Sequence, residues 1–191
     1  MTSNSRIIGF SLDRDLLISL ESLSDTLTKI FKDEEYYYKW AIVFSHSTIQ
    51  ASMCLCLDVV DSRLVRNRNS YDKDYGDLDT IEWLYKKLLK TEFIIYTNAL
   101  IINENDFPLK FIQTLQIVRN TFIHQSPELY VFEKQELREL IMLSVRLIRF
   151  LVSHSERMAL DIIKNDIENV ICTIENQLTN NWCGTATLPH N

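Results

Sequence analysis

Two side chains in residues 118–127 have the types needed for chemistry on a phosphodiester. Arg119 carries a permanent positive charge with forked donors that suit a phosphate, and His124 titrates near neutral pH and can move protons. On an ideal helix residues five apart point about 140° from each other, so these two side chains do not line up directly, whereas Asn120 and His124 share a face. We expect the long side chain of Arg119, and distortion of the last helical turn before Pro127, to bring both groups to the rim of one cleft.

The same residues also have ordinary structural interpretations. Arg119 could pair with a carboxylate on a neighbouring helix, and His124 could cap a helix end, where a cation is favourable. Among the other histidines, His46 lies in a mostly apolar segment and fits a hydrogen-bonded core or cleft residue better than a base. His154 suits a helix junction, and His190 suits a solvated tail.

Composition excludes several kinds of site. With three glycines in 191 residues the chain cannot build a P-loop or a G-x-G-x-x-G turn. No H-E-x-x-H or C-x-x-C spacing occurs, so the sequence predicts no metal site and no cofactor. The cysteines are expected to be reduced, buried thiols. They are Cys54, Cys56, Cys172 and Cys183.

Charge and hydropathy indicate where the protein works. The net charge of −6 argues against a broad surface that coats nucleic acid, although a local basic cleft is compatible with it. No stretch approaches about 20 uncharged apolar residues, and the first residues lack the basic-then-apolar order of a signal peptide. We therefore expect a cytoplasmic protein without a membrane partner.

Apolar periodicity predicts helices throughout the chain, with no alternating strand of convincing length. The expected fold is an all-α, up-and-down bundle of about five to six helices in one domain, residues 1–179, followed by a C-terminal tail, residues 180–191. The predicted helices cover approximately 12–31, 35–62, 79–101, 108–126, 134–153 and 153–177.

Three local signals place the ends of these helices. Asp79 and Glu82 have the spacing of an N-cap with a reciprocating glutamate, and Ser153 and Glu156 repeat that spacing. Pro108 suits the first position of a helix. The segment 134–178 would approach about 67 Å as a single helix, so we expect a break near Ser153.

Within this helical context, Arg119-Asn120-x-x-x-His124 resembles the R-x4-6-H signature of the HEPN superfamily, in which a polar residue commonly follows the arginine. The segment 36–47 is similar to the second helix of some prokaryotic HEPN proteins, and the motif arrives two helices later. The resemblance spans roughly residues 12 to 152 and implies a HEPN-like helical bundle that dimerises around the motif.

The resemblance also implies an activity. Many HEPN proteins are metal-independent ribonucleases of toxin–antitoxin, abortive-infection or other phage-defence systems, so RNA, a second copy of the chain, and an antitoxin or companion defence protein are the expected partners. Arg119, Asn120 and His124 are then the expected catalytic residues. Other HEPN proteins are inactive or bind nucleotides, so a non-catalytic module that binds a nucleotide or a partner protein is the alternative, and a structural helical adaptor is a third.

A polar loop before the third predicted helix contains further candidate RNA contacts. Four cations there could hold phosphates, and Tyr71 could stack on a base. Neighbouring aspartates at positions 72, 74 and 77 dilute the charge, so a solvated loop is the competing interpretation. The cations are Arg63, Arg66, Arg68 and Lys73.

Overall fold

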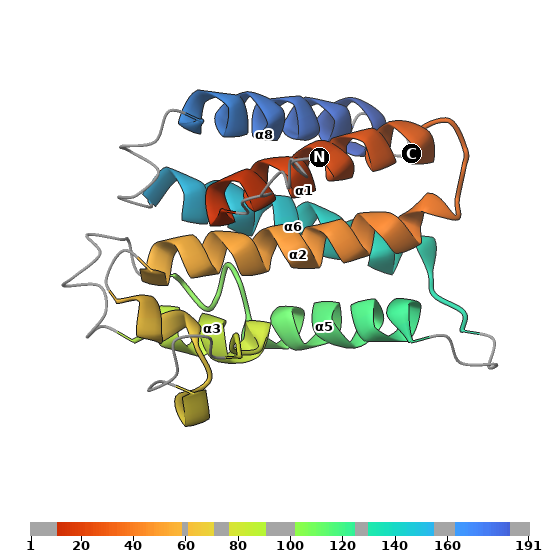
Figure 1. Ribbon diagram of the computed structural model, residues 1–191. Helices are drawn as coiled ribbons and strands as arrows, with labels where there is room; N and C mark the ends of the chain where they lie inside the picture. The colour runs from red at the N-terminus through yellow and green to blue at the C-terminus, as the bar shows by residue number, and fades with distance from the viewer. Residues whose placement is uncertain are drawn as a thin grey trace, which may run out of the picture.

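The computed structural model describes residues 11–58, 61–70, 77–90, 102–124, 130–154 and 163–183, and these form a helical bundle (Figure 1). Its α-helices are α1 (Leu12–Ile30), α2 (Tyr37–Asp58), α3 (Ile81–Leu88), α5 (Leu109–Ile123), α6 (Lys134–His154) and α8 (Lys164–Leu178). Two short 3₁₀ turns, η1 (Ser62–Val65) and η2 (Arg68–Ser70), and a π-helical turn, η3 (Thr179–Cys183), complete the described elements. Apart from one isolated bridge between Arg66 and Leu78, the described residues form no strand, which confirms the all-α prediction.

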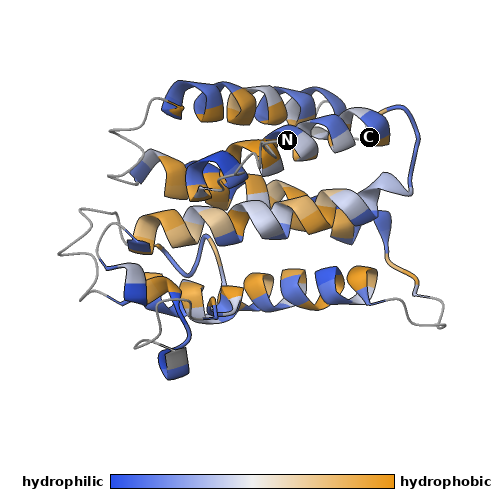
Figure 2. Ribbon diagram, in the orientation of Figure 1, coloured by the Kyte–Doolittle hydropathy of each residue, from blue (hydrophilic) through white to orange (hydrophobic). Residues whose placement is uncertain are grey.

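Helix α2 runs through the middle of the bundle. It packs against α1 most extensively, and also against α6, α5 and α3, while α8 lies over α1 and α6 (Figure 1). Fourteen of its 22 residues are buried, so α2 is apolar around most of its circumference. By length and composition alone it also meets the requirements of a membrane-spanning helix, with a mean hydropathy of 1.3, but 67% of that window is buried inside the bundle. Figure 2 shows its mostly orange and pale colouring.

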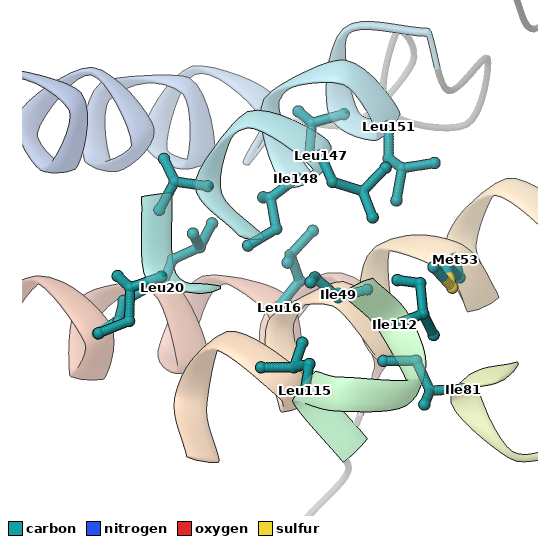
Figure 3. Packing of buried hydrophobic residues seen from close by; sticks show 14 of the residues in the cluster. Leu16, Leu20, Ile49, Met53, Ile81, Ile112, Leu115, Leu147, Ile148 and Leu151 are labelled. Atoms are coloured by element: carbon teal, nitrogen blue, oxygen red, sulfur yellow. The ribbon is translucent and has the colours of Figure 1, made fainter. Parts of the chain in front are cut away.

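Each helix contributes buried aliphatic side chains to one continuous core (Figure 3). Leu16 and Leu20 of α1 meet Ile49 of α2, and Ile112 and Leu115 of α5 close the core on the opposite side of α2. Every one of these five side chains is at most 1% exposed. Because burial of an aliphatic side chain contributes about 1.5–3 kcal/mol, this core is the main stabilising force that holds α5 in place.

Several helix ends differ from the predicted ones. Helix α3 stops at Leu88 with Leu89 as its C-cap, instead of continuing to 101, and residues 91–101 lie outside the described part of the chain. Its N-cap is Thr80, whose hydroxyl accepts a hydrogen bond from the Trp83 N–H at 3.4 Å, because the predicted cap, Asp79, pairs with Lys87 instead. Helix α2 is described as far as residue 58, residues 59–60 lie outside the described part of the chain, and residue 62 belongs to η1 rather than to α2 as predicted.

The remaining boundaries follow the prediction more closely. Pro108 is the N-cap of α5 rather than its first residue, with an extended ψ of 142°. Helix α6 is described as far as His154 and α8 begins at Lys164 after the N-cap Ile163, so residues 134–178 do not form one helix, as the sequence predicts. The position of the break near Ser153 stays a prediction, because residues 155–162, which include most of the restart predicted at Ser153–Glu156, lie outside the described residues. Helix α8 ends one residue after the predicted 177.

The C-terminal boundary at 179 is the last difference. Thr179–Cys183 continue the chain as a π-helical turn, and the Trp182 ring lies 5.4 Å from the Phe31 ring and 6.2 Å from the Tyr38 ring. Trp182 therefore packs against the bundle, although it lies in the segment 180–191 that the sequence predicts as a tail. The rest of the predicted tail lies outside the described residues.

Candidate functional site at the end of helix α5

Helix α5 positions the predicted motif through its buried side. Phe111, Ile112, Leu115 and Val118 are buried against the core, so the last turn of α5 is fixed against α2. The helix ends at Ile123, before the predicted 126, and His124 is its C-cap with an extended ψ of 102°. The main-chain N–H of His124 still donates to the carbonyl of Asn120 at 2.9 Å, which closes the last turn.

Arg119 is directed along the helix toward its neighbour in the motif. Its Nη1 donates a hydrogen bond to Oδ1 of Asn120 at 3.0 Å, and its Nε is buried without a hydrogen-bond partner. None of the ion pairs among the described residues involves Arg119. The expectation that it merely pairs with a carboxylate on another helix is therefore not met in the described part of the chain, and its buried Nε–H donates to none of the described residues.

His124 has a different environment. Its side chain is exposed, and within the described residues its ring makes no hydrogen bond, so its role as a cap is carried by the main chain. No direct contact joins its ring to the guanidinium of Arg119. Asn120 is the link between them, because its side chain accepts from Arg119 and its carbonyl accepts from the His124 N–H.

A second histidine lies near Arg119, and the sequence did not single it out as a site residue. His46 of α2 is only 6% exposed, and its Nδ1 has no hydrogen-bond partner. Burial, and to a smaller extent the positive charge of Arg119, lowers the pKa of His46 to about 4. The ring is therefore neutral at pH 7. His46 and Arg119 thus each contain one buried polar atom that lacks a hydrogen-bond partner among the described residues.

The four cations of the predicted RNA-contacting loop differ in their environments, and only some of them could contact RNA as predicted. Arg63 is held by Asp61, with Nη2 and Oδ2 2.5 Å apart, and this hydrogen bonding lowers the pKa of Asp61 to about 2. Arg66 forms the isolated bridge with Leu78, so its main chain is held in place within the fold. Arg68 is exposed, and Lys73 lies outside the described residues.

Arg68 instead joins residues of α3 that the sequence analysis passed over. A cavity of about 390 Å³ lies between the η2 segment and α3, and its lining includes Trp83, Lys86 and Lys90. The signal was present in the sequence, because Trp83, Lys86 and Lys90 are spaced i, i+3 and i+7 and lie on one face of a helix. The structure brings that face and Arg68 together.

The described residues contain no group of three or more histidine, cysteine, aspartate or glutamate side chains that could hold a metal ion. Cys54 and Cys56 are buried free thiols, as expected, whereas Cys172 is an exposed one. Burial is the main cause that raises the pKa of Cys54 to about 12, so its thiol is protonated and unreactive at neutral pH.

Comparisons of the chain with protein-family models, with curated proteins and with solved structures return no significant match. The resemblance to HEPN proteins therefore depends on the motif and its helical context.

Proposed function

We propose that the protein is a metal-independent endoribonuclease of the HEPN type, which cleaves RNA at a composite site formed by two copies of the chain. The observation that carries the proposal is the arrangement at the end of α5. Arg119, which has no carboxylate partner among the described residues, is hydrogen-bonded to Asn120, and the exposed His124 follows at the helix terminus. A cytoplasmic location and an antitoxin or companion defence protein belong to the same proposal.

The chemistry follows from the residue types. A neutral His124 takes the proton from a ribose 2′-OH, and the 2′-oxygen attacks the adjacent phosphorus. The guanidinium of Arg119 stabilises the negative charge that develops on the phosphoryl oxygens, and Asn120 orients that guanidinium through the 3.0 Å hydrogen bond. The bond from phosphorus to the 5′-oxygen breaks, and that oxygen takes up a proton. The products are a 2′,3′-cyclic phosphate and a 5′-hydroxyl.

A second copy of the chain provides the acid that donates a proton to the leaving 5′-oxygen. Asn120 and His124 lie on the outer side of α5 together with Ile117, whose side chain is 65% exposed. A two-fold contact along this face presents both His124 rings to one RNA strand, one as the base and the other, protonated, as the acid. It also covers an apolar residue that solvent otherwise contacts.

The direct test compares wild type with His124→Ala, using purified proteins and RNA in the presence of EDTA. Because a general acid–base group contributes about 10² to 10⁴ in rate, we expect the variant to lose at least about a hundredfold. Arg119→Lys keeps the charge but not the forked donors, and we expect it to be nearly as impaired. The product ends are identified enzymatically: a polynucleotide kinase should phosphorylate the new 5′-hydroxyl directly, and a ligase that requires a 3′-hydroxyl should not join the end that carries the 2′,3′-cyclic phosphate.

His154→Gln is the matched control, because His154 also ends a helix but lies on α6. It should cleave like wild type. Equal cleavage by wild type and His124→Ala, or activity abolished by EDTA, would contradict the proposal. Expression of each variant in cells adds a growth-inhibition readout for the proposed toxin role.

A non-catalytic HEPN module is the second candidate function. The basic cavity beside α3 favours it, because that cavity offers cations and an exposed aromatic ring to a nucleotide without requiring the motif. If no RNA is cleaved while a nucleotide still binds, this alternative replaces the nuclease.

A further inference from the structure

The cavity beside α3 is held open by a network that leaves its cations available. Nζ of Lys87 lies 2.6 Å from Oδ2 of Asp79 and donates to the carbonyls of Leu64 and Arg66 at 2.7 and 3.1 Å. The bridge between Arg66 and Leu78 adds two further main-chain hydrogen bonds. This network joins the η1–η2 segment to α3, so the cavity between them has a fixed shape.

Positive charge dominates the lining. Asp79 is the one carboxylate among the described lining residues, and Lys87 neutralises it. Arg68 and Lys90 are both exposed, and no carboxylate among the described residues pairs with either of them. Lys86 pairs with Glu82 at 2.6 Å, at the rim. In a chain with a net charge of −6, such a local excess of cations favours an anionic ligand.

The second feature of the cavity is an exposed aromatic ring. The side chain of Trp83 is 56% exposed, and Nζ of Lys86 lies 4.8 Å from the centroid of its ring. Asn69 lines the same cavity with a side-chain amide that offers donors and an acceptor. Asn67 lines it too, with its Oδ1 accepting a hydrogen bond from the main-chain N–H of Asn69 at 3.1 Å. An indole that is open to solvent between cations is the arrangement on which bases of single-stranded nucleic acid stack.

We propose that this cavity binds one or two nucleotides of single-stranded RNA, with a base stacked on Trp83 and the adjacent phosphates held by Arg68 and Lys90. The volume of about 390 Å³ lies within the range of small-ligand pockets. Only the biological use of this site rests on the proposed function, because in that function the cavity holds the RNA strand before it is cleaved. The binding itself does not require the motif.

The position of the cavity relative to the motif supports that use. Glu82 accepts a hydrogen bond from Gln113 at 3.2 Å, which places α3 beside the first half of α5 (Figure 1). Gln113 and His124 are eleven residues apart, so about 16 Å of α5 separates His124 from the point where α3, which lines the cavity, contacts α5. At about 3.4 Å for each stacked nucleotide, roughly five nucleotides span that length.

The test measures the binding of a fluorescently labelled 2′-O-methyl oligouridylate of twelve nucleotides to the wild-type chain by anisotropy. The methyl group blocks attack by the 2′-oxygen, so binding is measured without cleavage. Arg68→Glu and Lys90→Glu should each weaken binding at least tenfold at low salt, and Trp83→Leu should do so by about tenfold. Trp83→Phe keeps a stacking ring and should retain most of the affinity. Lys32→Glu, in the turn between α1 and α2, is the control and should bind like wild type.

A duplex and two polyanions, used as further ligands, test whether the cavity recognises unpaired bases or only negative charge. A duplex of the same length should bind at least tenfold more weakly, because its bases are not free to stack. If polyphosphate or polyglutamate competes as well as the oligonucleotide, or if Trp83→Leu binds normally while remaining folded by circular dichroism, the proposal is wrong. Cleavage of natural RNA is scored separately. Lost binding in the cavity variants without any wild-type cleavage overturns the nuclease alone, whereas unchanged binding with active cleavage overturns the cavity site alone.

Discussion

His46 of α2 and Arg119 of α5 are the most unusual neighbouring side chains in the described part of the bundle, because each contains a buried polar atom without a hydrogen-bond partner among the described residues. Burying a polar group without a hydrogen bond costs about 1–3 kcal/mol, and here both residues contain such an atom. Proteins retain such groups most often where they serve a function. The positive charge of Arg119 contributes to keeping the His46 ring neutral, while the guanidinium of Arg119 donates a hydrogen bond to Asn120.

The lowered pKa of His46 predicts that the free energy of unfolding depends on pH. The unfolded chain takes up a proton on this residue near pH 6.5, whereas the folded chain does so only near pH 4. Below about pH 6.5 the unfolded state therefore binds more protons, and the free energy of unfolding falls as the pH falls, by up to about 3 kcal/mol at pH 4. Urea unfolding between pH 4 and pH 7.5 measures this dependence.

His46→Gln removes the titrating ring and should flatten the curve over the same interval. His154→Gln is the comparison, because His154 is less buried. If the wild type and His46→Gln lose stability equally between pH 6.5 and pH 4, other groups cause the loss and His46 is not buried in the neutral form.

The sequence singled out Arg119, Asn120 and His124 as candidate site residues but could not give their contacts. Helical spacing predicted that Arg119 and His124 do not lie side by side, and the described structure agrees, because only Asn120 joins them. His46 could not be placed beside Arg119 from the sequence, since the rotation of α2 against α5 is set by packing of the whole core.

At the scale of elements, the ion pair between Asp79 and Lys87 determines how the η1–η2 segment lies on α3. Both side chains are nearly buried, with 8% and 12% exposed. Removing one member of such a pair leaves an uncompensated charge, while the other contacts of Lys87 with the carbonyls of Leu64 and Arg66 persist. The pair is therefore structural, and it shapes the cavity without being available to a ligand.

We expect Asp79→Asn to lower the free energy of unfolding by about 2–4 kcal/mol. Glu82→Gln, which breaks the more exposed pair with Lys86, should cost at most about 1 kcal/mol. Chemical denaturation of both variants at pH 7 measures the difference. Equal losses would show that the Asp79–Lys87 pair contributes no more than a surface ion pair.

Periodicity predicted the long helices α1 and α6 because each has one clear apolar side, and it failed at the ends of α3. There, two candidate caps stand next to each other in the sequence. A tertiary partner, Lys87, takes Asp79 out of the competition and leaves Thr80 as the N-cap. Local sequence patterns for a helix N-terminus do not include Lys87, which lies eight residues after Asp79 and forms an ion pair with it in the folded chain.

At the scale of the whole molecule, the proposed mechanism requires two copies, and Ile117 provides the means to separate them. Ile117→Asp places a charge in the proposed two-fold contact beside His124 and should convert the dimer to a monomer in light scattering. Cleavage should fall in parallel, by about a hundredfold or more if the acid comes from the second copy.

Ile18→Asp is the matched control, because Ile18 is an isoleucine of similar exposure, 54%, on α1. It should stay dimeric and active. A wild-type protein that is strictly monomeric, or a monomeric Ile117→Asp that cleaves at the wild-type rate, rules out the two-histidine mechanism.

The contact of α8 and Trp182 with the first two helices also determines when the fold can close. Gln177 binds Ser24 and Thr28 of α1, and Trp182 packs on Phe31, so partners about 150 residues apart must meet. During synthesis at about 5–20 residues per second, α1 and α2 wait on the order of ten seconds for α8 to emerge. Over that interval the side of α1 that α8 covers is open to water, and to any chaperone that recognises apolar helices. The arrangement of the helices therefore delays completion of the bundle until nearly all of the described chain has left the ribosome.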